Sequence, residues 1–336
     1  MYTEQDVLAS LGTVLDPDIH QDIVSLGFVK HIKIAETSLS FTVTLTTPVC
    51  PLKDVIRLNC EAAIHRDLPR IKTITITFDA QVRPDSRIAD SIAGTIKNII
   101  AVGSGKGGVG KSTVSVNIAC ALAKEGALVG LLDCDIYGPN IPRMTGAAGL
   151  PLERDEKIVP MEKHGIQIMS MGYLIPPNQA LVWRGPMIHS AVRQLFTDVA
   201  WREIDYLIVD LPPGTGDAQM SLAQSVPVTG AIIVTMPQLV ALDDARRGAD
   251  AFTRLSVPVL GIVENMTGAV FGSGGGASLA DELAVPFIGS IELEAGITAS
   301  INTGRPYVLD HDDGISAAYH AIARHIAVRC SMAAIP

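Results

Sequence analysis

Short apolar runs alternate with helical hydrophobic periodicity over most of the chain. The runs occupy residues 99–102, 128–132, 166–169, 206–209, 231–235, 259–263 and 286–288. Between them, apolar residues recur at the three- and four-residue spacing of helices that bury one face. Strands that are apolar throughout are typical of parallel sheets covered on both faces. The pattern therefore predicts an α/β fold, with a mostly parallel sheet flanked by helices.

The first 80 residues have a different pattern. They predict a helix at 3–15, strands at 28–35 and 39–45, a helix at 51–67 and a strand at 71–78. Residues 1–80 thus read as a small α+β domain. Residues 81–97 carry Pro84, Gly94 and several charges, so we interpret them as a linker to a second domain at 98–336.

A glycine-rich loop joins the first apolar run of the second domain to a helical segment. Residues 105–112 match G-x-x-x-x-G-K-[ST], a loop whose backbone amides cradle phosphates. The predicted nucleotide-binding residues here are Gly105, Lys106, Gly107, Gly108, Val109, Gly110, Lys111, Ser112 and Thr113. We expect Lys111 to contact the β- and γ-phosphates of ATP as a catalytic cation, and the Ser112 hydroxyl to bind Mg²⁺.

Lys106 is a second lysine in this loop. At the second position it cannot easily reach the phosphates of its own loop. We therefore predict that it crosses a two-fold interface and offsets charge on the γ-phosphate bound by a partner chain. Under this hypothesis the protein is a homodimer and Lys106 is catalytic. The alternative is a solvated lysine in an ordinary glycine-rich turn.

Polar residues follow three further apolar runs, at the sheet edge where ligands of such folds bind. Asp135 is the candidate for positioning the attacking water, with Asp133 nearer Mg²⁺ or the loop lysine; alternatively, both carboxylates cap the following turn. Asp210 is predicted to be catalytic and to hold Mg²⁺ through water. The loop at 211–217 is either a γ-phosphate sensor or a rigid turn. The Asn265 amide is expected to read the adenine edge.

Composition narrows the function classes. A net charge of −9 and a pI near 5.3 argue against non-specific nucleic-acid binding. No apolar run approaches the roughly 20 residues of a membrane span, and the N-terminus does not resemble a signal peptide, so we expect no membrane partner and a cytoplasmic location. Five cysteines, an odd number, fit a reducing compartment. The eight histidines show no metal-ligand spacing.

Together these motifs resemble the deviant-Walker family of dimeric ATPases that includes MinD, ParA and the nitrogenase iron protein, and within it the Mrp/ApbC branch of iron–sulfur cluster carriers. The similarity rests on residues 105–113, 133–142, 183–187, 210–217, 264–266 and 271–276. The N-terminal segments 16–17, 22–27 and 46–51 resemble the small domain of iron–sulfur assembly factors. The resemblance implies slow ATP hydrolysis, coupled to receiving a [4Fe–4S] cluster from donors and passing it to apo-proteins.

The sequence departs from that branch at the cluster ligands. Relatives commonly carry a C-x-x-C pair before the glycine-rich turn, whereas residues 267–270 here are Thr-Gly-Ala-Val. Because iron–sulfur clusters require thiolates, the usual bridging site cannot form. Cys50 is the remaining candidate ligand, since it precedes a predicted helix whose N-terminus favours thiolate. Cys60, Cys120 and Cys134 are expected to be core residues. The sequence around Cys330 indicates no role for this residue.

Two other functions stay open at this point. The first is a MinD- or ParA-like dimeric ATPase switch for positioning or partner recruitment without a cluster. Its membrane contact could be the helical tail at 315–332, although a packing helix is the expected role of that tail. The second is a metabolic ATPase or kinase, although the sequence contains no motif that indicates a substrate pocket.

Overall fold

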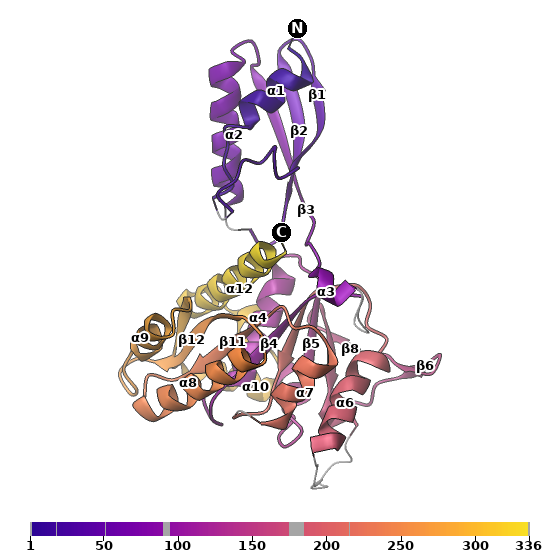
Figure 1. The fold of residues 1–336 in the computed structure, drawn as a ribbon, viewed down its shortest axis with the longest axis vertical. Coiled ribbons are helices and arrows are strands. Elements are labelled where there is room, and N and C mark those ends of the chain that lie inside the picture. Colours follow the sequence, from indigo (N-terminus) through magenta and orange to yellow (C-terminus); the bar gives the residue numbers. More distant parts are fainter. Residues whose placement is uncertain are drawn as a thin grey trace. The chain divides into compact units, whose positions relative to one another are not determined.

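The computed structural model describes residues 2–17, 19–50, 52–89, 95–174, 185–214 and 216–334. The chain divides into two compact units, Met1–Arg83 and Pro84–Ala334. Figure 1 shows the helices and strands of both units. Each unit has its own hydrophobic core.

The smaller unit is a three-stranded sheet packed against two helices. β2 (Ser38–Leu45) lies in the middle, antiparallel to β1 (Val29–Ile34) and parallel to β3 (Thr73–Ala80). The helices are α1 (Glu4–Leu11) and α2 (Lys53–Asp67). α1 begins at a capping box, in which Thr3 and Asp6 satisfy each other's backbone amides. The order of elements in the small α+β domain matches the prediction, with α1 ending earlier than expected, at Leu11.

The larger unit is built on an eight-stranded sheet of order β13-β12-β11-β4-β10-β5-β9-β8. Every neighbouring pair is parallel except β8 with β9. The strands are β4 (Ile96–Gly103), β5 (Val129–Asp133), β8 (Met161–Lys163), β9 (Ile166–Ser170), β10 (Ile204–Asp210), β11 (Gly230–Thr235), β12 (Val259–Thr267) and β13 (Phe287–Glu292). The predicted α/β fold with a mostly parallel sheet is confirmed.

Helices cover both faces of this sheet (Figure 1). They are α3 (Ser86–Ala89), α4 (Lys111–Lys124), α5 (Ile141–Thr145), α6 (Gly185–Thr197), α7 (Asp217–Ser225), α8 (Leu239–Arg254), α9 (Gly275–Glu282), α10 (Ala295–Thr303), α11 (Tyr307–Asp310) and α12 (Gly314–Ala333). A 3₁₀ turn, η1 (Met171–Tyr173), follows β9, and β6 (Glu153–Arg154) pairs with β7 (Lys157–Ile158). Along β4, Ile99 and Ala101 share one core cluster with residues of α6, α7 and α8.

The segment expected to be a linker, 81–97, differs from that expectation. It contains α3, and β4 already begins at Ile96. Ile88 of α3 is fully buried in the core of the larger unit. An isoleucine in that core removes apolar surface from water, which a solvated linker would not do. The unit boundary therefore lies at Arg83, and residues 90–94 fall outside the described residues.

The C-terminal helix packs against α4. Tyr319, Ile322 and Ile326 of α12 are fully buried. Glu125, just after α4, accepts hydrogen bonds from His320 at 2.6 Å and from Arg324 at 3.1 Å. The helical tail therefore has the packing role expected of it. Among the described residues, we find no helix with the length and apolar character of a membrane span.

Candidate nucleotide site

The glycine-rich loop runs from the end of β4 to the start of α4, as its motif requires. Gly108 and Gly110 adopt positive φ angles of 83° and 81°, which side chains disfavour. Gly105 lies against α8: a Cβ there would stand 1.9 Å from the carbonyl carbon of Asp244. The loop is thereby pressed onto α8 on one side and leads into the N-terminus of α4, where backbone amides favour anions.

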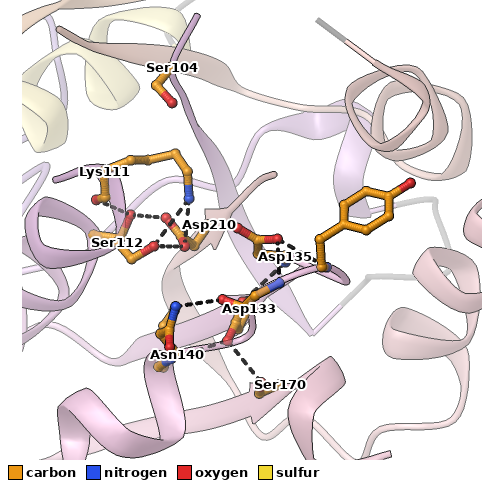
Figure 2. Close-up of polar contacts among 12 residues, drawn as sticks. Ser104, Lys111, Ser112, Asp133, Asp135, Asn140, Ser170 and Asp210 are labelled. Atoms are coloured by element: carbon orange, nitrogen blue, oxygen red, sulfur yellow. Dashed lines mark hydrogen bonds and ion pairs between the residues drawn. The ribbon is translucent and has the colours of Figure 1, made fainter. Parts of the chain in front are cut away.

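A buried cluster of polar side chains lies beneath the loop (Figure 2). The Lys111 Nζ is 2.7 Å from Oδ2 of Asp210, and both side chains are at least 95% buried. The Ser112 hydroxyl donates to the same Oδ2 at 2.6 Å, and Ser115, one turn along α4, donates to Oδ1 at 2.6 Å. Asp210 thus receives a cation and two hydroxyls. The structure brings together Lys111, Ser112 and Asp210 and adds Ser115, and the roles of the first three toward ATP and Mg²⁺ stay predictions.

The oxygen atoms of this cluster suit Mg²⁺. Mg²⁺ prefers a few protein oxygens, with water and phosphate completing its coordination. Ser112, in the first turn of α4, would supply a hydroxyl oxygen, and Asp210, at the end of β10, would supply a carboxylate that acts through water.

The carboxylates after β5 hold the turn that follows them. Asp133 is fully buried and accepts the backbone N–H groups of Asp135 at 3.1 Å and Ile141 at 3.2 Å. Oδ1 of Asp135 accepts those of Tyr137 at 3.2 Å and Gly138 at 3.1 Å. Both carboxylates therefore cap this turn, and positioning of the attacking water by Asp135 stays a prediction. The Ser170 hydroxyl also donates to Asp133 at 2.9 Å. The expectation that Asp133 lies nearer Mg²⁺ or the loop lysine stays a prediction.

Burial sets the electrostatics of this edge. It raises the pKa of Asp133 to about 7, and the nearby Asp210 carboxylate adds to the effect. Burial also raises the pKa of Asp135, which Lys111 opposes. Burial also raises the pKa of the Cys134 thiol well above its usual value, because a thiolate there would lose its hydration. The neighbouring carboxylates of Asp133 and Asp210 add to this effect.

Asn265 braces the loop from the opposite side. Its Nδ2 donates to the Val109 carbonyl at 2.9 Å, and the residue is 4% exposed. The preceding Glu264, to which the sequence assigned no separate role, accepts the N–H groups of Gly274 at 2.9 Å and Gly276 at 2.6 Å. The end of β12 thus connects the phosphate loop to the glycine-rich turn before α9. Adenine reading by Asn265 stays a prediction.

An open pocket of about 210 Å³ lies over the loop. Its lining consists of Ser104, residues 106–113, Asp135, Asn140, Met144 and Pro213. Lys106 is half-buried there, and its side chain makes no hydrogen bond or ion pair in the described part of the chain. Gly105 and Asn265 are not part of the lining: Gly105 lies against α8, and Asn265 donates to the loop carbonyl of Val109.

The loop after Asp210 is attached to the phosphate loop. The Gly214 N–H donates to the Ser104 carbonyl at 2.8 Å, and the Leu211 N–H donates to the Val102 carbonyl at 3.2 Å. Movement of this loop on γ-phosphate binding stays a prediction. Thr215, and residues 183 and 184 of the predicted 183–187 motif, lie outside the described residues.

The cysteines do not form a cluster site in the larger unit. Cys120, Cys134 and Cys330 are at most 1% exposed, and burial raises the pKa of Cys120 and of Cys330 to about 12. Cys60 of the smaller unit is buried as well. Cys50 is the half-buried exception, and it lies three residues before α2 rather than within its first turn. No three His, Cys, Asp or Glu side chains gather as a metal site within the described ranges.

Comparisons with known proteins agree with this geometry. The model of the NUBPL iron-transfer P-loop NTPase matches residues 95–327. The chain belongs to this family. A model described as iron–sulfur cluster assembly protein matches residues 4–78. The resemblance to the Mrp/ApbC branch is thereby confirmed.

Full-length relatives carry a consistent name. A Synechocystis protein named iron–sulfur cluster carrier protein is 46% identical, with the whole of both chains covered. A Deinococcus radiodurans protein of the same name is also 46% identical, over 97% of this chain and 95% of the relative. Among solved structures, an Archaeoglobus fulgidus nucleotide-binding protein in complex with ADP is 35% identical, with a TM-score of 0.56, covering 65% of this chain and 90% of that one.

Proposed function

We propose that this P-loop NTPase hydrolyses ATP slowly, as a homodimer, and couples hydrolysis to carrying iron–sulfur clusters. The observation that supports the ATPase most directly is the buried Lys111, Ser112 and Asp210 cluster beneath a phosphate loop, with Asp135 lining the same pocket. This arrangement places a cationic side chain, oxygen ligands for a metal ion and a carboxylate that can orient water around one phosphate loop.

The proposed hydrolysis assigns a task to each side chain. A water oxygen attacks the γ-phosphorus, and the bond from that phosphorus to the β,γ-bridging oxygen breaks. Asp135 orients the water, and Lys111 compensates the charge of the β- and γ-phosphates. Mg²⁺, when bound through Ser112 and through water on Asp210, supplies further charge neutralisation. Lys106 of one chain completes the site of the other.

The cluster is proposed as cargo that comes from donor proteins and goes to apo-proteins. Support comes from the relatives, which are named iron–sulfur cluster carrier proteins. The buried cysteines of the larger unit do not fit a cluster, because burial holds those thiols protonated. Cys50 is the ligand we propose, and each chain of the homodimer would supply one thiolate. An odd number of cysteines, five, is in keeping with a cytoplasmic location.

Anaerobic reconstitution with iron and sulfide tests the cargo proposal. We expect thiolate-to-iron absorbance and bound iron in the wild type, loss of both in Cys50→Ser, and retention in Cys60→Ala, the matched control whose thiol is buried in the same unit. If neither the nucleotide-free nor the ATP-bound wild type holds a cluster, the carrier proposal is wrong.

That negative result would favour the second candidate, a MinD- or ParA-like switch that recruits partners without a cluster. The observation in its favour is the lack of an accessible thiol among the described residues of the larger unit. In this case ATP hydrolysis would persist in Cys50→Ser and in the absence of iron.

A further inference from the structure

Asp133 accepts hydrogen bonds from the segment that follows it and from the neighbouring strand β9. Its two backbone donors, Asp135 and Ile141, lie at the two ends of the turn that carries the water-orienting carboxylate. Its third donor is the Ser170 hydroxyl at the end of β9, at 2.9 Å. Since Ser170 and Asp133 are register partners in the parallel pair of β9 and β5, the two side chains meet across neighbouring strands.

Ser170 is itself held in one orientation. It is fully buried, and its Oγ accepts the Gly172 N–H at 2.9 Å. With an acceptor position filled in this way, the hydroxyl proton is directed at Asp133. Gly172 also lies close to Pro139 of the turn: a Cβ at Gly172 would stand 3.1 Å from the Pro139 Cβ. The end of β9 therefore supports the 135–141 turn both through Asp133 and by direct packing.

Asp135 depends on that support. Within the described residues, its hydrogen bonds are made by Oδ1, to amides of the same turn. Its place above the phosphate loop is thus set by the turn, and the turn is set by Asp133. We infer that Ser170 is a positioning residue for ATP hydrolysis, which holds the Asp133 carboxylate and thereby the turn that presents Asp135 to the nucleotide (Figure 2).

This inference rests on the proposed ATPase function, but it concerns turnover and not binding. Lys111 and Ser112 contact Asp210, and Ser170 touches neither of them in the described structure. Loss of the Ser170 hydroxyl leaves a buried carboxylate short of a donor and free to rotate. A displaced Asp135 would then slow the chemical step, because misplacement by about 1 Å can reduce a rate roughly a hundredfold.

The experiment compares steady-state ATP hydrolysis with equilibrium binding of MgATP in the full-length protein. In Ser170→Ala we expect kcat to fall by about ten- to a hundredfold, with the Kd for MgATP within about twofold of wild type. Ser170→Thr, which keeps the hydroxyl, should recover most of the turnover. The matched control is Ser300→Ala, which removes a buried hydroxyl that donates to the Gly296 carbonyl of α10.

The outcomes separate this inference from the function on which it rests. Wild-type turnover that is lost in Asp135→Asn but unchanged in Ser170→Ala would overturn the role of Ser170 alone. An equal loss of binding and turnover would also overturn it, since it would indicate general damage to the site. If Ser170→Ala does not fold, Asp133→Asn provides the same comparison, because an amide nitrogen cannot accept from Ser170 or Ile141. A wild type without ATP hydrolysis would contradict the proposed function itself.

Discussion

At the scale of single residues, the site depends on a close approach of backbone at Gly105. A Cβ on this residue would stand 1.9 Å from the Asp244 carbonyl carbon and 2.5 Å from the Ala245 nitrogen, and backbone cannot rotate away as a side chain can. We expect Gly105→Ala to destabilise the larger unit by at least about 2 kcal/mol, as overpacking does. The corresponding fall in melting temperature is about 4–8 °C.

The matched control is Gly107→Ala in the same loop, where the nearest atom to an added Cβ is the Pro213 Cγ at 3.8 Å. Its melting temperature in differential scanning fluorimetry should stay close to that of wild type. Equal melting temperatures for the two variants would show that α8 does not constrain the loop at Gly105.

Some residues of the site could be predicted from the sequence, and others could not. The motif identified Lys111, Ser112 and Asp210 because fixed spacing between a glycine-rich loop and a strand end carries the signal. Ser115 and Ser170 carry no such signal, because a serine inside a helix or strand looks like any other small polar residue. Their importance comes from the carboxylates they face, Asp210 and Asp133, and only tertiary structure places them together.

At the scale of elements, the end of β12 braces the phosphate loop through Asn265. Removal of the amide in Asn265→Ala leaves the buried Val109 carbonyl without that donor, at a cost of about 1–3 kcal/mol. If the loop loosens by that amount, ATP affinity falls by about tenfold. GTP affinity should fall in parallel, because the loop binds phosphates and not the base.

Isothermal titration with both nucleotides measures this effect. Thr267→Val is the control on the same strand, since it removes a hydroxyl that donates to the Ile291 carbonyl and should leave both affinities unchanged. A loss confined to ATP would instead assign Asn265 to the adenine edge, as the sequence alone suggested.

The elements themselves were the most predictable part of the molecule. Each of the apolar runs in the larger unit became a strand of one sheet, because strands buried on both faces need apolar side chains at every position. The antiparallel edge strand β8 and the hairpin of β6 and β7 were not predicted. Their exposed residues, such as Glu153, Arg154 and Glu162, resemble those of a loop. The sequence predicted a linker where α3 lies, because a single isoleucine, Ile88, among charged residues gives no helical hydrophobic periodicity.

At the scale of the whole molecule, the distribution of thiols is the unusual property of this chain. Residues 267–270 contain no cysteine. The structure adds that Cys120, Cys134 and Cys330 are buried, so the larger unit offers no replacement among its described residues. Exposure of a cysteine depends on which face of its element meets the core, and a sequence indicates this only in part. The ATPase site and the candidate cluster ligand therefore lie in different units of the chain.

The homodimer can be tested by complementation between two inactive variants. Lys106→Ala retains a site with its own Asp135 but cannot complete the site of its partner, whereas Asp135→Asn lacks the water-orienting carboxylate but still supplies Lys106. Each variant alone should bind ATP and show little hydrolysis. Mixed in equal amounts, they should recover about a quarter of wild-type turnover, because half of randomly paired dimers are mixed and each has one complete site. A mixture of Lys111→Ala with Asp135→Asn is the control, since neither chain then holds a complete site. If turnover in the first mixture stays at the level of the separate variants, Lys106 does not act across a dimer.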